Sequence, residues 1–384
     1  MIPYGRQDIS QKDIDAVVDV LRSDFLTQGP VVPRFERLVA DYCRASHAIA
    51  VNSATSALHI ACLALDVGPG DRVWTSPITF VASANCALYC GASIDFVDID
   101  PLSANMSIAA LEAKLAEAEH QGTLPKVVIP VHMAGQSCDM AAIGALGKRY
   151  GFRIIEDASH AVGGRYRGEP VGNCQHSDIT VFSFHPVKII TTAEGGMALT
   201  NDASLAQRMV NLRSHGVTRD PEQLTGPQHG PWYYEQLELG FNYRLTELHA
   251  ALGMSQLQRL DDFVSRRHAI ADRYDMALAK LPLVPLSRHP DAYSSFHLYI
   301  IRLCLTELRT SHVAVFEQLR ATGIGVNLHY MPVYLQPYFR RMGFAQGLCP
   351  EAERYYGEAI SLPIFPALSE ADQDRIVSAL ANLR

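Results

Sequence analysis

A single lysine stands in an apolar segment of the chain. Lys188 lies in SFHPVKIITTAEGG, residues 183–196, where the only other charged residue is Glu194. Removing a lysine from water is costly, so such a side chain either reaches solvent or is kept as an amine that can react. The segments that precede Lys188 decide between these two interpretations.

Two adjacent carboxylates end the apolar run in RIIEDASHA, where Glu156 and Asp157 follow two isoleucines. Successive side chains of a strand point to opposite faces, so only one of the two faces a site at the strand end. We expect that residue to be Asp157, with His160 one helical turn further on. The alternative is an aspartate that caps a helix.

Two earlier segments offer a phosphate site and an aromatic ring. In NSATSAL, Ser53, Thr55 and Ser56 stand where a helix is expected to begin, and the free N–H groups of a helix start favour a phosphate. In WTSPITF, Phe80 follows an apolar run, where its ring could stack on a planar ligand. A helix cap without a ligand and a phenylalanine of the core are the alternatives.

The apolar runs predict the elements that position these side chains. They alternate with helical patterns in the manner of a mainly parallel sheet covered by helices, and such α/β sheets bind ligands at the carboxyl ends of their strands. We expect strands within residues 47–53, 71–77, 93–100, 126–132, 153–159, 178–184 and 197–202.

The pattern changes after about residue 244. Residues 244–281 predict one long amphipathic helix or a bent pair of helices that ends at Pro282. A strand within 294–305, a helix closed by Gly323 and a serine-capped helix within 369–383 complete a smaller α+β unit. We therefore expect a large domain of residues 1–250 and a small domain of residues 251–384, with residues 219–231 as a flexible or partner-contacting loop.

Composition excludes several classes of protein. Of the 384 residues, 48% are hydrophobic and 19% charged, which is typical of a globular enzyme. A net charge of -7 argues against nucleic acid as a partner. The chain has neither a signal-peptide pattern nor an apolar run that could span a bilayer, so we expect a cytoplasmic protein. Its eight cysteines lack paired spacing, which predicts reduced thiols and no metal.

Together these residues match the needs of pyridoxal 5'-phosphate (PLP). A lysine forms a Schiff base with this cofactor, and an acid keeps its ring nitrogen protonated so that the ring acts as an electron sink. A helix start holds the phosphate, and an aromatic ring stacks on the cofactor. A nicotinamide-dependent oxidoreductase is disfavoured because no G-x-G-x-x-G follows the first expected strand.

The chain resembles the DegT/DnrJ/EryC1/StrS family of sugar aminotransferases over essentially its whole length. The matching segments are NSATSAL, EDASHA, SFHPVKIITTAEGG and LGFNYRLTELHAALGMSQL. The resemblance implies fold type I, an α/β fold like that of aspartate aminotransferase, with a large mainly parallel sheet domain and a smaller C-terminal α+β domain.

The resemblance also implies roles for individual residues. Lys188 would form the Schiff base, Asp157 would pair with the ring nitrogen, and Phe80 would stack on the ring. His160 would lie close to the ring, where many family members carry glutamine. The phosphate would be held by Thr55, Ser56 and Ser183 and, from the second subunit of a homodimer, by Asn242. The nucleotide-sugar pocket would include Tyr4, Thr27, His329 and Tyr330.

Several segments resemble one group of family members, which aminate UDP-2-acetamido-2,6-dideoxy-β-L-arabino-hexos-4-ulose in pseudaminic acid biosynthesis. These segments are LTQGP, DASHA, SFH, RSHG, HYMPVY and SLPIFP. L-Glutamate is then the expected amino donor. Dehydratases of the family carry histidine in place of the lysine, so Lys188 favours amino transfer. The alternatives are another UDP- or dTDP-keto sugar, or a PLP-fold protein that binds a ligand without catalysis.

Overall fold

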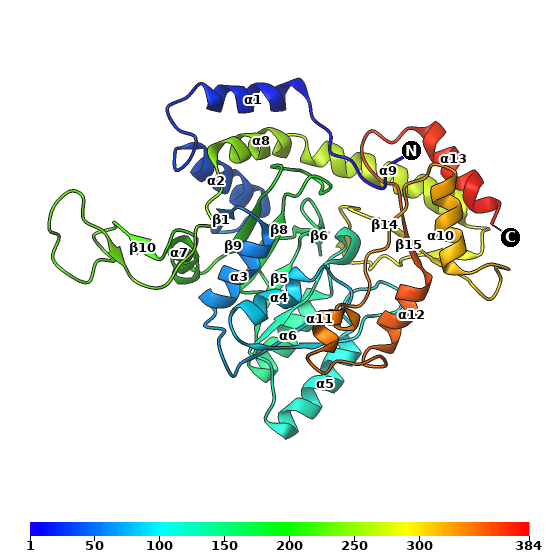
Figure 1. Ribbon diagram of the computed structural model, residues 1–384, viewed down its shortest axis with the longest axis horizontal. Coiled ribbons are helices and arrows are strands. Elements are labelled where there is room, and N and C mark those ends of the chain that lie inside the picture. Colours follow the sequence, from blue (N-terminus) through cyan, green and yellow to red (C-terminus); the bar gives the residue numbers. More distant parts are fainter. Residues whose placement is uncertain (384) are drawn as a thin grey trace.

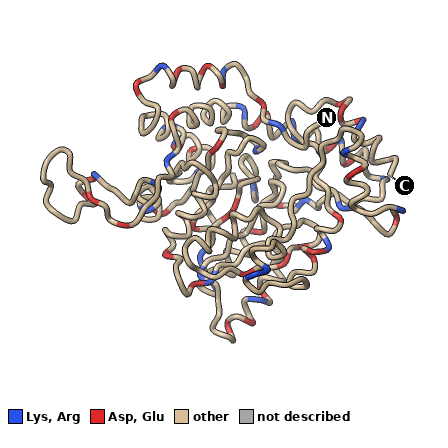
Figure 2. Tube along the Cα trace, in the orientation of Figure 1, with Lys and Arg blue, Asp and Glu red and all other residues tan. Residues whose placement is uncertain are grey.

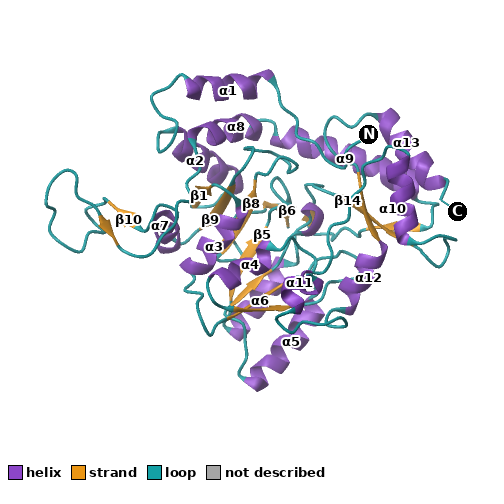
Figure 3. Ribbon diagram, in the orientation of Figure 1, coloured by secondary structure: helices purple, strands orange, loops and turns teal. Residues whose placement is uncertain are grey.

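A seven-stranded sheet forms the centre of the computed structural model, which describes residues 1–383. All of its strands run parallel except β9, which pairs antiparallel with β1 and with β8. The predicted mainly parallel sheet is therefore confirmed (Figure 3). In spatial order the strands are β1 (His47–Val51), β9 (Gly196–Thr200), β8 (Ile179–Ser183), β5 (Arg153–Asp157), β4 (Val127–Ile129), β2 (Arg72–Thr75) and β3 (Ser93–Phe96).

Helices cover both faces of this sheet because its strands are apolar on both sides. In β8, for example, Val181 packs into one hydrophobic core and the next residue, Phe182, packs into another. Such two-sided burial is typical of parallel sheets. The helices of this part are α1 (Gln11–Leu21), α2 (Val31–Cys43), α3 (Ala54–Ala64), α4 (Ala82–Tyr89), α5 (Ile108–Gln121), α6 (Met140–Tyr150) and α7 (Ala203–Leu212).

The C-terminal part is an α+β unit with its own core. The predicted bent helix pair is present as α8 (Glu247–Leu257) and α9 (Leu260–Leu278). A small antiparallel sheet follows, in the order β12 (Leu283–Pro285), β14 (Tyr299–Leu303) and β15 (Ala359–Leu362). It packs with α10 (His312–Ala321), α12 (Pro350–Glu358) and the serine-capped α13 (Glu370–Ala381). The proposed division after residue 250 stays a prediction, and that position lies within α8.

Short elements complete the chain between these larger ones. They are the strands β6 (Arg165–Tyr166), β7 (Glu169–Pro170), β10 (Val217–Thr218), β11 (Glu235–Gln236) and β13 (Ala292–Tyr293), the 3-10 turns η1 (Met133–Gly135) and η2 (Val333–Leu335), and the helix α11 (Pro337–Arg340). The loop between β10 and β11, which contains residues 219–231, projects from the body of the molecule (Figure 1). Its contact with a partner stays a prediction.

The first residues of the chain are attached to the C-terminal part of the structure. The Ile2 N–H group donates to the carbonyl of Gly323 at 2.8 Å, and the Ile2 carbonyl accepts from Gly325 at 2.6 Å. The N–H group of Ile364 then donates to the Tyr4 carbonyl at 3.0 Å. Both ends of the chain lie on the same side of the molecule (Figure 1). This pairing places Tyr4 between the two parts of the chain.

Charge is spread over the whole trace. Figure 2 shows Lys and Arg interspersed with Asp and Glu. Within the described part of the chain, no helix combines the length and the apolar character that crossing a membrane requires.

Candidate active site

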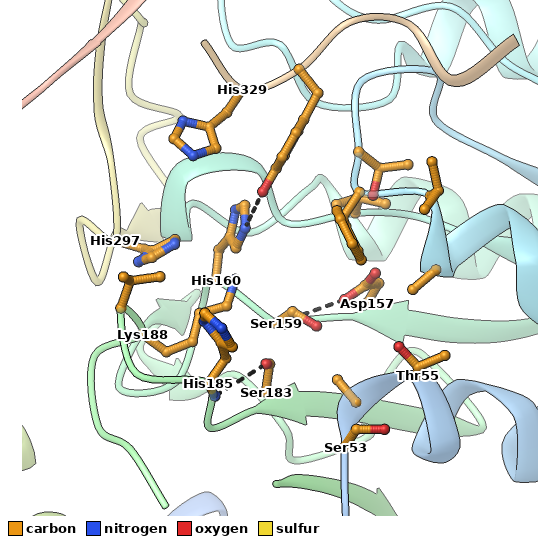
Figure 4. A pocket seen from close by; sticks show the side chains of 18 of the residues that line it. Ser53, Thr55, Asp157, Ser159, His160, Ser183, His185, Lys188, His297 and His329 are labelled. Carbon is orange, nitrogen blue, oxygen red and sulfur yellow. Dashed lines mark hydrogen bonds between the residues drawn. The ribbon is translucent and has the colours of Figure 1, made fainter. Parts of the chain in front are cut away.

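A cavity of about 720 Å³ lies where the carboxyl ends of β5 and β8 meet the start of α3. This is the edge at which open α/β sheets bind ligands. Figure 4 shows Lys188, His160 and His297 on one side of the cavity and Thr55 with Ser53 on the other. Of the residues predicted from the sequence, it is lined by Tyr4, Thr55, Phe80, Asp157, His160, Ser183, Lys188, His329 and Tyr330.

Lys188 reaches into this cavity from the turn that follows β8. The backbone N–H group of Lys188 donates to the His185 carbonyl at 2.9 Å, and this hydrogen bond closes the turn. Burial lowers the pKa of the Lys188 amine to about 8, and the negative charge of Asp157 acts in the opposite direction. An appreciable fraction of the amine is therefore neutral near neutral pH, as a nucleophile or a general base requires.

The alternation of β5 separates its two carboxylates. Asp157 lines the cavity and is 5% exposed, whereas Glu156 points away and contacts His132 Nε2 at 2.7 Å. Asp157 Oδ2 accepts a hydrogen bond from the Ser83 hydroxyl at 2.5 Å, and Oδ1 accepts from the Ser159 N–H group at 3.1 Å. The hydrogen bonds from Ser83 and Ser159 thus hold the Asp157 carboxylate in one orientation toward the cavity.

Ser83 was not predicted from the sequence, although a local signal exists. It follows Thr79 by four residues, and the two hydroxyls lie 2.7 Å apart. Thr79 lies three residues before α4 and Ser83 in its first turn, and this spacing predicts that the two side chains share a face. The sequence does not show that this face meets Asp157, which lies 74 residues further on.

The start of α3 is capped by Ser53, whose hydroxyl accepts from the Ser56 N–H group at 3.1 Å. Thr55 lines the cavity, as does Ser183 from the end of β8. The Ser56 side chain instead donates to Asn52 Oδ1 at 2.6 Å and does not line the cavity. The helix start therefore offers N–H groups and hydroxyls suited to a phosphate, and a direct role of Ser56 stays a prediction.

Gly196 allows the helix start to lie directly on β9. A Cβ atom at this position would lie 2.5 Å from the backbone nitrogen of Ala54 and 2.5 Å from the carbonyl carbon of Ser53. Real Cβ atoms do not approach backbone this closely. Any side chain at residue 196 must therefore displace the start of α3.

We expect Gly196→Ala to weaken binding of PLP by at least about tenfold, because a displaced helix start no longer aims its N–H groups at the phosphate. Titration of the cofactor-free chain with PLP, followed by absorbance, measures this. The matched control is Gly357→Ala, since a Cβ on this exposed helix glycine meets no atom within 4 Å. Equal affinities of the two variants would contradict the assignment of this phosphate site.

Three of the four histidines that line the cavity have a pKa that favours the neutral form. Burial and then the Lys188 charge lower the pKa of His160 and of His297 well below the usual value, and the same two causes lower that of His329 to about 3. His160 Nε2 lies 3.2 Å from the hydroxyl of Tyr330, and this contact is drawn in Figure 4. The cavity thus holds several uncharged hydrogen-bonding groups around one amine and one carboxylate.

The outer part of the cavity is aromatic. The Phe80 ring is 60% exposed, and its centroid lies 6.4 Å from that of Tyr330. The Tyr4 ring lies 5.3 Å from that of His329. Further lining residues that the sequence analysis did not select are Ser159, His297, Asn327 and Gln336.

Two predicted residues lie outside the cavity of their own chain. Thr27 is exposed and forms a bridge with Thr246, and Asn242 is exposed and forms a bridge with Ser214. The position of Asn242 agrees with its expected action on a second subunit, which a single chain does not test. The roles of both residues stay predictions.

The residues of the cavity fit PLP. A lysine, a fixed carboxylate, an exposed aromatic ring and a capped helix start surround one space, which has the size and chemistry that this cofactor needs. The α/β fold and this set of groups define a PLP-dependent enzyme of fold type I.

Comparison with known proteins identifies the family. The model of the DegT/DnrJ/EryC1/StrS aminotransferase family matches residues 7–381. The chain belongs to this family and is a PLP-dependent sugar aminotransferase. The predicted family, fold type and cofactor are therefore confirmed.

Relatives are similar over the full chain. "Spore coat polysaccharide biosynthesis protein SpsC" of Bacillus subtilis is 37% identical over 385 residues, which is 100% of this chain and 97% of the relative. The solved structure "Putative sugar aminotransferase Spr1654 from Streptococcus pneumoniae, PMP-form" has a TM-score of 0.88 at 31% identity, and the match covers 99% of this chain and 98% of that chain. PseC of Helicobacter pylori, "involved in the biosynthesis of pseudoaminic acid", gives the same TM-score of 0.88, 31% identity and coverage of 99% and 98%.

Proposed function

We propose that this aminotransferase converts UDP-2-acetamido-2,6-dideoxy-β-L-arabino-hexos-4-ulose to UDP-4-amino-4,6-dideoxy-N-acetyl-β-L-altrosamine, with L-glutamate as the amino donor. This reaction belongs to pseudaminic acid biosynthesis. The observation that carries amino transfer is the amine of Lys188 facing the fixed carboxylate of Asp157 across one cavity. The choice of sugar is supported by the matching segments of the sequence and by the similarity to PseC.

Lys188 has two tasks in this reaction. Bound PLP supplies an electron sink for the electron pair of the broken C–H bond. The neutral Lys188 Nζ would take the proton from Cα of glutamate, and in the half-reaction with the sugar the protonated amine would deliver a proton to C4. Its lowered pKa suits both directions, since the amine gains and loses a proton near neutral pH.

The other cavity residues hold and orient the reactants. Asp157 is the group that would pair with the ring nitrogen, and Thr55 and Ser183 would hold the phosphate. Phe80 would stack on the ring, and His160, fixed by Tyr330, would lie beside it. On the outer side, the uncharged polar tips of Tyr4, Asn327, His329, Tyr330 and Gln336 suit hydroxyl, amide and uracil groups of a UDP sugar.

The proposal includes a homodimer in which Asn242 reaches the phosphate of the partner's site. We expect that mixing two inactive variants, Lys188→Ala and Asn242→Ala, in equal amounts restores activity at about a quarter of the sites. About half of the dimers then contain one chain of each variant, and each such dimer has one site of two in which both residues are intact. The measurement is turnover before and after the mixture is unfolded and refolded together. Mixtures that stay inactive would contradict shared sites.

A screen of keto-sugar nucleotides with glutamate, followed through release of 2-oxoglutarate, tests the substrate. We expect the highest kcat/KM for the proposed UDP-4-keto sugar. The screen includes UDP-4-keto sugars of bacillosamine and aminoarabinose type and a dTDP-3-keto sugar, because SpsC acts in spore coat polysaccharide biosynthesis. A higher kcat/KM with any of these would replace the proposed substrate. A chain whose cofactor is never converted by glutamate would instead be a binding protein.

A further inference from the structure

A histidine from the C-terminal part, His297, enters the cavity without a role in the reaction described above. It lies two residues before β14 and lines the cavity together with Lys188. His297 is only 4% exposed, and the centroid of its ring lies 4.4 Å from that of the His160 ring. Because the ring is buried in the cavity of the reacting amine, the hydrogen-bond partners of its two nitrogen atoms need to be identified.

Hydrogen bonds distinguish His297 from His160 and His329. His160 Nε2 is held by the Tyr330 hydroxyl, and His329 Nδ1 lies 2.8 Å from the Ser361 hydroxyl. The buried Nδ1 of His297 has no hydrogen-bond partner anywhere in residues 1–383. His160 Nδ1 also lacks one there, but the Tyr330 contact already fixes that ring. A buried polar atom left unpaired in this way requires an explanation, such as an ordered water, strain or a role in catalysis.

The backbone around His297 is held by two side chains. The buried Arg267 donates through Nη1 to the carbonyls of Phe296 and His297 at 3.0 and 3.4 Å. The Ser295 hydroxyl donates to the His160 carbonyl at 2.8 Å. Phe296 has a φ of 49°, in the left-handed region that side chains disfavour. Phe296 therefore keeps an unfavourable backbone conformation, and the residue that follows it, His297, lines the cavity.

The charge state of His297 follows from its surroundings. Burial, the charges of Lys188 and Arg267 and the neighbouring histidines lower its pKa well below the usual value, so that it is neutral at neutral pH. A neutral imidazole carries one lone pair and one N–H group. The other titratable groups that line the same cavity are Tyr4, Asp157, His160, His185, Glu194, His329 and Tyr330.

We propose that His297 is a positioning residue for the Lys188 amine. Once Nζ has taken the proton from Cα, the neutral ring accepts a hydrogen bond from the resulting ammonium and holds it beside the reacting carbon. The C–H bond breaks, its electron pair enters the bound cofactor, and an N–H bond forms at Lys188. His297 neither gains nor loses a proton. The inference rests on Lys188 as the reacting amine, as proposed above.

The kinetic test uses His297→Phe, which keeps a ring against His160 and removes both nitrogens. In single turnovers of the holoenzyme with glutamate, we expect the rate to fall by at least about tenfold and the effect of deuterium at Cα to increase, since proton transfer becomes slower. The half-saturating glutamate concentration is expected to change less than about twofold, because a positioning role acts after binding. His297→Asn, whose amide oxygen is an acceptor, is expected to restore part of the rate.

A second readout uses the full chain without its cofactor. The pH dependence of reductive methylation by ¹³C-formaldehyde, observed by NMR, gives the pKa of Lys188, which is expected to be about 8. An acceptor that stabilises the ammonium raises this pKa, so its removal in His297→Phe is expected to lower it by about one unit. His297→Asn is expected to lie between the two, which separates loss of the acceptor from a merely more apolar cavity.

The matched control is His268→Phe, because His268 belongs to helix α9 and its ring packs on Phe296, the residue before His297. It removes the contact of His268 Nε2 with the Ser294 carbonyl at 2.7 Å, but His268 does not line the cavity. We expect this variant to keep the isotope effect and the Lys188 pKa of the unaltered enzyme. The proposal is overturned if His297→Phe keeps them too, or if both variants lose them equally. A Lys188→Ala enzyme that still exchanges the Cα proton would instead contradict the assignment of Lys188.

Discussion

Lys188→Ala is expected to lower turnover by about 10³-fold to 10⁴-fold and to remove the visible absorbance of the lysine-bound cofactor at the same time. The first loss follows because general base and acid catalysis at one atom contributes about this much. The second follows because no other lysine lines the cavity formed by residues 1–383. Steady-state kinetics with glutamate and a spectrum of the same sample measure the two effects.

Lys188→Arg is the matched control for this loss. Arginine keeps a positive charge in the cavity, but its guanidinium stays protonated and cannot accept the Cα proton. We expect it to be as inactive as the alanine variant. Recovery of activity with arginine would show that a positive charge, rather than a transferable proton, is what the site needs from residue 188.

Asp157→Asn is expected to lower turnover by about 10²-fold to 10³-fold, with little change in folding stability. The amide still accepts from the Ser159 N–H group and still meets the Ser83 hydroxyl, so the local hydrogen bonds are kept. It carries no charge to hold a proton on a ring nitrogen, so the electron sink is weakened. Kinetics with glutamate and thermal unfolding of the same variant separate the two effects.

Ser83→Ala provides the graded comparison. It removes one donor to Asp157 and keeps the carboxylate, so we expect a loss of about tenfold, well below that of the asparagine variant. If Ser83→Ala and Asp157→Asn were equally impaired, orientation rather than charge would be the main contribution of Asp157.

The large part of the fold could be predicted because its strands are continuous apolar runs. Strands β5 and β8 are buried on both faces, and each ends at a polar residue that faces the cavity, Asp157 or Ser183. In a parallel sheet, such ends lie at one edge, so local patterns were sufficient to gather Asp157, Ser183 and Lys188. The same reasoning placed Thr55 at the helix start on that edge.

The residues that the sequence analysis missed come from contacts between distant parts of the chain. His297 meets His160 across more than a hundred residues, and its segment is otherwise an ordinary strand start. The Ser56 hydroxyl is bonded to Asn52, four residues earlier, and its predicted contact with a phosphate stays a prediction. Short-range patterns therefore identify the strand ends but not which distant side chains complete the site.

The attachment of residues 2–4 to the C-terminal part has a consequence for synthesis on the ribosome. Ile2 and Tyr4 are made before their partners Gly323, Gly325 and Ile364, which come much later in the sequence. Residues 2–4 therefore remain unpaired until Ile364 has left the ribosome. The wall of the cavity that contains Tyr4 closes last, so an incomplete nascent chain does not present a finished pocket to cofactor or sugar.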